Sequence, residues 1–256
     1  MASKLTVTAT NRFVNRVTDI TSEPLDILPP IKGFENEPLV TLEESVERLT
    51  TLVPDVKHMV WTVKKKCSKK PPTHLTLDQC ASIMLYTLEW SPHEQSFYLI
   101  LNQTLRSENR QKLKPWFRYL KLFVVALSRL SSIPCHIYRG VKENLAKQYP
   151  TGSTFVWWAF SSCTKTIEVL GAEEFLGQCG ERTIFSIHCS SGIDIGEHSF
   201  HPDENEILLL AARQFQVDSC TNLGDGLQMI ELKEIPSPHP LLAEVSQRIE
   251  KENIIL

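Results

Sequence analysis

The chain has 256 residues, of which 42% are hydrophobic and 22% charged, and its formal net charge is -3. This length allows one large domain or two small ones and is ample for a sizeable core. The near-neutral balance gives no global attraction to nucleic acid or to an anionic membrane. No stretch approaches the roughly 18 apolar residues that a membrane span needs. We therefore expect neither nucleic acid nor a membrane as a partner.

The cysteine pattern favours reduced thiols over a disulfide framework. The seven cysteines are odd in number, no two form a Cys-x-x-Cys pair, and no hydrophobic signal segment opens the chain. We expect a cytoplasmic protein. Residues 1–22 carry Lys4, Arg12 and Arg16 before their first acid, as a mitochondrial presequence could, but their apolar spacing is poor. A loosely ordered N-terminus is the better interpretation.

The first half of the chain reads as helical. Prolines between residues 24 and 38 indicate an extended lead-in, and Thr41 then caps a segment in which Leu42, Val46 and Leu49 recur at helical spacing. Further helices are predicted over residues 56–66, from Thr76 onward, and over 95–105 and 115–130.

The second half changes to short segments rich in β-branched and aromatic residues. Such segments predict strands over 136–140, 154–160, 182–189, 213–217 and 227–232, and a short helix over 241–250. Helices followed by strands predict an α+β fold with antiparallel sheets. We expect one domain over residues 23–256, with a helical part over about 40–131 and a strand part over about 132–236.

Several familiar motifs are missing. The sequence has no phosphate-binding Gly-x-x-x-x-Gly-Lys loop, no Gly-x-Gly-x-x-Gly after a strand, and no Gly-x-Ser-x-Gly elbow. His198 and His201 with Asp203 could hint at a metal, but they stand in a proline-containing stretch, whereas metal-binding histidines usually lie on a regular element. We expect no metal.

Three features at predicted strand ends can carry chemistry. Arg139, followed by Gly140, interrupts an apolar strand, and a guanidinium there can fork across a pyrophosphate. Small hydroxyls at Ser161 and Ser162 follow the aromatic strand and can hold a carboxylate in place. Glu204 and Glu206 come just before an apolar run, and at a spacing of two on an extended segment they face the same way.

Together and in this order, these features resemble the arginine–serine–glutamate class of mono-ADP-ribosyltransferases. That class has an Arg at the end of a first strand, a Ser-Thr-Ser triplet on a second and Glu-x-Glu at a third, matched here by Arg139, by residues 161–163 and by residues 204–206. The likeness extends to Tyr98, Asn102 and Arg106 at helical spacing and to residues 214–217, and covers residues 24–235.

The resemblance implies an ADP-ribosyltransferase fold, in which a helical half packs on an antiparallel β-sandwich of two roughly perpendicular sheets with NAD in the cleft between them. It implies that NAD is the co-substrate and that Arg139 binds a pyrophosphate or ribose oxygen. The backbone of Gly140 would bond the nicotinamide amide. Ser161 would position Glu206, and Glu206 would hold the 2′-hydroxyl of the nicotinamide ribose.

The resemblance also implies the acceptor. Glu204 would orient the guanidinium of an arginine-bearing acceptor protein and take its proton, since the class carries Glu there when arginine is the target. Tyr98 and Asn102 match positions that contact NAD, although core packing accounts for them equally well. Phe175 is a candidate for stacking on nicotinamide. Cys163 departs from the triplet, because a thiol donates hydrogen bonds weakly.

These residues predict a mono-ADP-ribosyltransferase that cleaves NAD, releases nicotinamide and modifies protein arginine. Two alternatives keep the fold: an NAD glycohydrolase that uses water as the acceptor, and a non-catalytic NAD-binding module. Glu204 disfavours the first, and the retained Arg139, Ser161 and Glu206 disfavour the second. Outside this class, the alternative is a soluble α+β scaffold protein.

Overall fold

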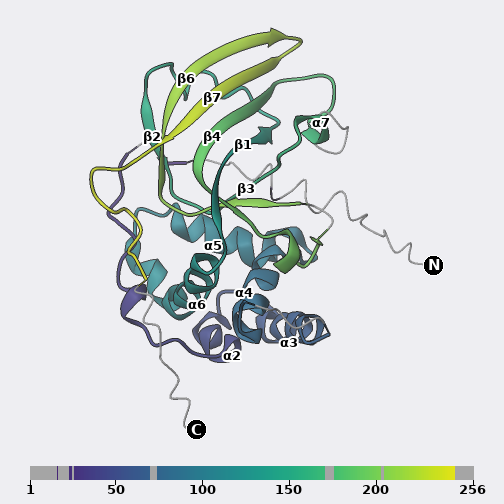
Figure 1. Ribbon diagram of the computed structural model, residues 1–256, viewed down its shortest axis with the longest axis vertical. Helices are drawn as coiled ribbons and strands as arrows, with labels where there is room; N and C mark the ends of the chain where they lie inside the picture. Colours follow the sequence, from purple (N-terminus) through teal and green to yellow (C-terminus); the bar gives the residue numbers. More distant parts are fainter. Residues whose placement is uncertain are drawn as a thin grey trace, which may run out of the picture.

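The computed structural model of the protein describes residues 16, 23–24, 26–69, 74–170, 176–202 and 205–245. Helices form one layer and strands the other, and the chain passes from the first to the second once (Figure 1). The last helix of the first half, α6, ends at Ser128, and the first strand, β1, begins at Ser132. The α+β class is therefore confirmed.

The helical half forms where the capping and periodicity signals predict it. Both predicted N-caps are capping boxes, in which Thr41 pairs with Glu44 and Thr76 with Gln79. The first helix is shorter than expected, because it continues as a 3-10 turn after Ser45. The helices are α2 (Leu42–Ser45), α3 (Val56–Cys67), α4 (Leu77–Thr87), α5 (Phe97–Leu105) and α6 (Phe117–Ser128).

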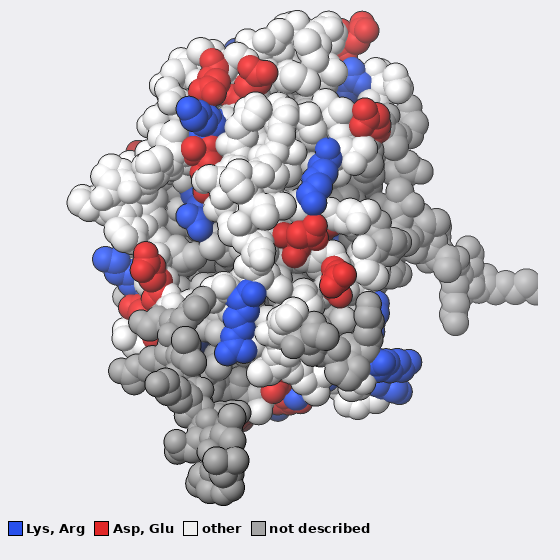
Figure 2. Space-filling view, viewed as in Figure 1, with Lys and Arg blue, Asp and Glu red and all other residues white. Residues whose placement is uncertain are grey.

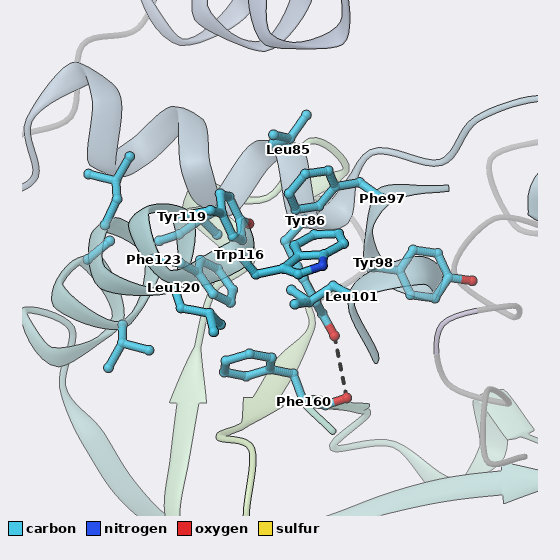
Figure 3. Packing of buried hydrophobic residues seen from close by; sticks show 14 of the residues in the cluster. Leu85, Tyr86, Phe97, Tyr98, Leu101, Trp116, Tyr119, Leu120, Phe123 and Phe160 are labelled. Carbon is cyan, nitrogen blue, oxygen red and sulfur yellow. Dashed lines mark hydrogen bonds between the residues drawn. The ribbon is translucent and has the colours of Figure 1, made fainter. Parts of the chain in front are cut away.

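Aromatic side chains make the centre of this half (Figure 3). Phe123 of α6 stacks on Tyr86 with ring centroids 5.2 Å apart and meets Phe160 edge-on at 5.0 Å. Phe160 comes from the strand half, so this cluster joins the two layers. The ring of Tyr98 meets Tyr86 edge-on at 6.2 Å, and its hydroxyl points away from the cluster in the same view. Within the described residues, no helix is long and apolar enough to cross a membrane.

Seven strands form one hydrogen-bonded network, in the order β2-β6-β7-β4-β5-β3, with β1 also paired to β4. The long central strand β4 pairs with β1 and β7 over most of its length and with β5 at its end. A single turn of helix, α7 (Ile167–Leu170), follows β3. The strands are β1 (Ser132–Val141), β2 (Thr154–Trp157), β3 (Ser161–Cys163), β4 (Arg182–Asp194), β5 (Ile207–Leu209), β6 (Arg213–Gly224) and β7 (Leu227–Ile235).

The expectation of purely antiparallel sheets is wrong for one pair. β4 and β7 run parallel, while all the other named pairs are antiparallel. The β6–β7 hairpin turns at Asp225 and Gly226, both at positive φ, and brings β7 back beside β4 in the same direction. The sheet is mixed. Its division into two perpendicular sheets stays a prediction.

The end of the described chain also differs from expectation. Residues 241–245 form no helix; instead Leu242 makes a parallel bridge to Ile31, and the N–H of Ala243 donates to the carbonyl of Ile31 at 3.0 Å. Three prolines between residues 236 and 240 favour this extended path. The rest of the predicted helix, residues 246–250, lies outside the described residues, as do residues 1–22 except Arg16.

Charged side chains of both signs are interspersed on the face of the molecule seen in Figure 2. This agrees with the small net charge of -3. That face presents no broad field of one sign that would attract a polyanion.

Candidate active site

Arg139 lies on β1 and is 1% exposed. Its Nη1 donates to the backbone carbonyl of Ser162 at 2.9 Å, which ties β1 to β3. A buried guanidinium needs such partners, because leaving the charge unsatisfied in the core is costly. Arg139 is therefore fixed between two strands and is not an exposed side chain at the sheet edge.

Gly140 pairs with Ile184 across β1 and β4. A Cβ atom at this position would come within 2.8 Å of Leu176 Cδ1. The glycine therefore lets Leu176 pack directly on the backbone of β1. Its predicted contact with nicotinamide stays a prediction.

The serine strand β3 pairs with β5, with Ser161 opposite Leu209 and Ser162 opposite Leu208. Directly opposed residues on antiparallel strands point to the same face, and faces alternate along each strand. Continued by one residue before β5, this alternation puts Glu206 on the face of Ser162. The hydroxyl of Ser161 donates instead to the carbonyl of Ala159, at a distance of 3.5 Å.

Cys163 lies at the end of β3 and is fully buried. Burial raises the pKa of its thiol to about 12, and Arg139 opposes part of that rise, while Glu206 is a smaller contributor that adds to it. Both charges therefore lie near this thiol. Residues more than sixty positions apart in the chain meet at the end of β3.

Glu206 is 0% exposed and directly precedes β5. The residue before it, Asn205, has a φ of 48°, and the carbonyl of Glu206 accepts from the N–H of Ile195 at 3.1 Å. Its Oε2 lies 3.4 Å from Nη2 of Arg16. Its Oε1 is buried and has no hydrogen-bond partner among the described residues. A buried acceptor of this kind calls for a donor.

The helical half also contributes residues to this site, beside the strands β1, β3 and β5. Asn102 on α5 donates through Nδ2 to the carbonyl of Phe160 at 3.2 Å and to the hydroxyl of Tyr86 at 3.3 Å. These bonds fix Asn102 against the residue that precedes β3. Its Oδ1 is buried and, within the part of the chain that the structure describes, accepts no hydrogen bond. The helical half thus presents a second buried acceptor, after Oε1 of Glu206, that lacks a donor among the described residues.

Tyr98 precedes Asn102 by one helical turn and is 1% exposed. Its hydroxyl lies 3.4 Å from Nε2 of His93, and Nδ1 of His93 lies 3.9 Å from a carboxylate oxygen of Glu89. Glu89 in turn lies 3.4 Å from Nη1 of Arg16. A chain of polar contacts therefore leads from Tyr98 to Arg16 and on to Glu206.

The structure brings Arg139, Ser161, Glu206 and Asn102 to one region, with Tyr98 linked to it. Glu204 and Phe175 lie outside the described residues. Sequence reasoning missed Glu89 and the position of Arg16, since a lone acid after a helix and an arginine near the N-terminus have no distinctive spacing. It named both Ser161 and Ser162 as hydroxyls that can hold a carboxylate, but assigned the positioning of Glu206 to Ser161 alone.

No described group of three or more His, Cys, Asp and Glu side chains could hold a metal ion. His198 lies instead with its Nδ1 3.9 Å from Cys80 Sγ, and Asp203 is outside the described residues. A cavity of about 600 Å³ lies beside residues 236–245 and includes none of the predicted site residues. Glu206 itself is 0% exposed.

Comparison with known proteins gives the same answer as the motifs. The profile of the family described as "NAD:arginine ADP-ribosyltransferase" matches residues 40–238. Among curated relatives, the erythroblast NAD(P)(+)–arginine ADP-ribosyltransferase of Gallus gallus is 27% identical over 172 residues, which cover 63% of this chain and 53% of the relative. The T-cell ecto-ADP-ribosyltransferase 2 of Rattus norvegicus is 33% identical over 92 residues, 36% of this chain and 32% of the relative.

The chain thus spans between a third and about half of the length of these relatives. Solved structures share its fold. The eucaryotic mono-ADP-ribosyltransferase ART2.2 superposes with a TM-score of 0.54 and 22% identity, covering 77% of this chain and 85% of that one. The ADP-ribosyltransferase HopU1 of Pseudomonas syringae superposes with a TM-score of 0.53 and 21% identity, covering 88% and 95%. With the family profile spanning both the helical and the strand half, the chain belongs to the NAD:arginine ADP-ribosyltransferase family.

Proposed function

We propose that this chain cleaves the bond between nicotinamide and ribose in NAD and transfers the ADP-ribose to an arginine of an acceptor protein. Membership in the family supports NAD as the co-substrate. Among proteins of the same fold, one structure of ART2.2 is a complex with NADH and one of the Vis toxin is a complex with agmatine, a guanidino compound.

One observation carries the proposal: Glu206 is a buried carboxylate whose Oε1 has no hydrogen-bond partner among the described residues. A ribose 2′-hydroxyl supplies the donor that this oxygen needs. As the bond from C1′ to nicotinamide breaks, the bonding electrons leave with nicotinamide and positive charge develops on the ribose. A carboxylate fixed beside that charge stabilises the transition state more than the ground state.

The other site residues support binding. Arg139 is held through Nη1 by the carbonyl of Ser162, and a guanidinium at this position is suited to a pyrophosphate or ribose oxygen. The Oδ1 of Asn102 can accept from an amide or hydroxyl of the nucleotide. We assign Ser162, on the Glu206 face of β3, to support that carboxylate together with or in place of Ser161.

The acceptor half of the reaction uses Glu204. In this proposal its carboxylate orients the acceptor guanidinium, whose nitrogen forms the new bond to C1′ and whose proton passes to the carboxylate. Phe175 is proposed to stack on nicotinamide. A cytoplasmic location and the absence of nucleic-acid and membrane partners stay predictions, and two curated relatives are described as ecto and GPI-linked enzymes.

The test is incubation with labelled NAD and agmatine, with nicotinamide release and agmatine labelling measured separately. Glu206→Gln is expected to lose both signals by at least ~100-fold, because it removes the charge that stabilises the transition state. Glu204→Ala is expected to lose agmatine labelling while nicotinamide release continues with water as the acceptor.

Glu197→Gln is the matched control, since Glu197 is exposed and lies on the same connection between β4 and β5. It should behave as the wild type. If the wild type releases free ADP-ribose and leaves agmatine unlabelled, the proposed activity is that of a glycohydrolase and not of a transferase. Full cleavage by Glu206→Gln would overturn the catalytic assignment.

A further inference from the structure

Arg16 is buried beside Glu206, 190 positions away in the sequence. Its Nη1 donates to the carbonyl of Thr87 at 2.7 Å and lies 3.4 Å from Oε1 of Glu89. Its Nη2 lies 3.4 Å from Oε2 of Glu206. The guanidinium therefore bridges the end of helix α4 and the residue before β5, one from each half of the molecule.

The charges explain why a cation belongs at this point. The side chain of Glu206 is 0% exposed and that of Glu89 is 5% exposed. Two buried carboxylates that share a site repel each other, and a cation between them removes that repulsion. A guanidinium is suited to the task, because its planar fork can reach two carboxylates and a carbonyl at once. Thr87, Glu89 and Glu206 thus present acceptors for this one kind of group.

The occupied site leaves Glu206 closed to other molecules. With Arg16 in place, the side chains of Arg16 and Glu206 are both 0% exposed. A ribose hydroxyl cannot approach the carboxylate from solvent in this arrangement. If Glu206 holds the ribose of NAD, the side chain of Arg16 must leave first.

We propose that Thr87, Glu89 and Glu206 form a guanidinium-binding site that Arg16 occupies in cis, so that the N-terminal segment competes with NAD. This inference rests on the proposed role of Glu206. Release of Arg16 exposes Glu206 to the nucleotide.

Glu23 fixes the chain close to this site, so the competition between Arg16 and NAD is intramolecular on the side of Arg16. Glu23 accepts from Nε of Arg106 at 2.5 Å and from the backbone N–H of Trp158 at 2.9 Å. Only seven positions separate Glu23 from Arg16, so a released Arg16 stays within reach of its site at high effective concentration. If the occupied state holds about nine tenths of the molecules, the apparent affinity for NAD falls about 10-fold.

The test compares the full chain with Arg16→Gln and, as the matched control, Arg12→Gln. Isothermal titration calorimetry gives the dissociation constant for NAD, and nicotinamide release gives KM and kcat. Arg16→Gln is expected to lower the dissociation constant and KM about 10-fold with kcat little changed, and Arg12→Gln to match the wild type. A synthetic peptide of residues 10–22 should inhibit Arg16→Gln competitively with NAD, and the same peptide with Gln at position 16 should not.

A second measurement does not depend on activity. Phenylglyoxal modification of Arg16, followed by mass spectrometry, should be slow in the free wild type and at least several-fold faster with saturating NAD. Rapid modification in free protein, or unchanged NAD affinity in Arg16→Gln while Glu206→Gln still abolishes cleavage, would overturn this inference alone. No NAD binding by either the wild type or Arg16→Gln would overturn the proposed function with it.

Discussion

The helical half and the strand half both bury polar side chains, but only the strand half buries the charged residues of the predicted catalytic motifs, Arg139 and Glu206. In the helical half these groups are mostly neutral and bond within the core, as where the hydroxyl of Tyr119 donates to the carbonyl of Ser82 at 2.9 Å. In the strand half they include Arg139, Arg182 and Glu206. A buried charge stabilises little by itself and is costly if a partner is lost. Arg106 and Glu89 are largely buried in the helical half as well, but that half serves mainly as packed support, and the strand half holds the charges proposed to act in the reaction.

The largest effect should come from disrupting the packed core of the helical half. Phe123→Ala removes a ring that is 0% exposed and contacts Tyr86, Tyr119 and Phe160. We expect the free energy of unfolding to fall by about 3–5 kcal/mol, while the folded fraction keeps its affinity for NAD. Urea denaturation measures the first and calorimetry the second. Leu52→Ala, at a position 44% exposed, should change stability by no more than ~0.5 kcal/mol.

The second largest effect should distinguish the roles of two buried arginines in the strand half, one proposed to bind NAD and one structural. Arg139→Lys keeps the charge but loses the planar fork, so NAD cleavage should fall by about 100-fold. Arg182→Lys is the matched control, because Arg182 also donates to backbone carbonyls, those of Gly177 and Asp225, at 2.7 and 3.0 Å. It should lose stability without a comparable loss of kcat/KM. Equal loss of activity in both would mean that Arg139 has only a structural role.

A smaller effect should show which serine supports Glu206. The pairing of β3 with β5 puts Ser162 on the face of Glu206, and Ser161 on the opposite one. We expect Ser162→Ala to lower kcat about 10-fold, a loss of about 1.4 kcal/mol, and Ser161→Ala to lower it less. Initial-rate measurements at saturating NAD distinguish the two. A larger loss in Ser161→Ala would restore the assignment made from the motif.

The smallest effect concerns pH. Burial raises the pKa of Cys163 to about 12, from an ordinary value of 9.0. The folded state therefore keeps the proton that the unfolded state loses, so this contribution to stability is complete below pH 9 and falls as pH rises toward 12. At pH 9.5 the loss should be about 0.8 kcal/mol. Burial also raises the pKa of Cys189 to about 12, so the measurement is a difference: urea denaturation from pH 8 to pH 9.5 should show a loss smaller by this amount in Cys163→Ala than in the wild type.

The same division decides how much could be predicted from the sequence. Capping boxes at Thr41 and Thr76 and the apolar spacing after them are local signals, so the helices were predicted well. Five of the seven strands were located, and the two missed, β3 and β5, are only three residues long. β4 and β6 extend past their apolar runs, because pairing with neighbours holds residues that propensity does not favour. The parallel pairing of β4 with β7 depends on the path of the chain, which no local pattern encodes.

The candidate site shows the same limit. The order of Arg139, the serine strand and Glu206 was enough to predict that they would meet, and the structure brings them together. Their exact neighbours were not predictable: which serine faces Glu206 depends on a one-residue register. The contact between Arg16 and Glu206 is further still from prediction, because it joins residues 190 positions apart.

The contacts of Glu23 with Arg106 and with the backbone of Trp158 have a consequence for solubility. β2 is an outer strand, with β6 as its partner in the sheet, and at only four residues it offers little backbone to a foreign chain. The amide that follows it, on Trp158, is already bonded to the carboxylate of Glu23. Exposed strand edges invite edge-to-edge aggregation, which short strands and charged side chains discourage. Removing these contacts with Glu23→Ala should therefore promote self-association during expression and storage.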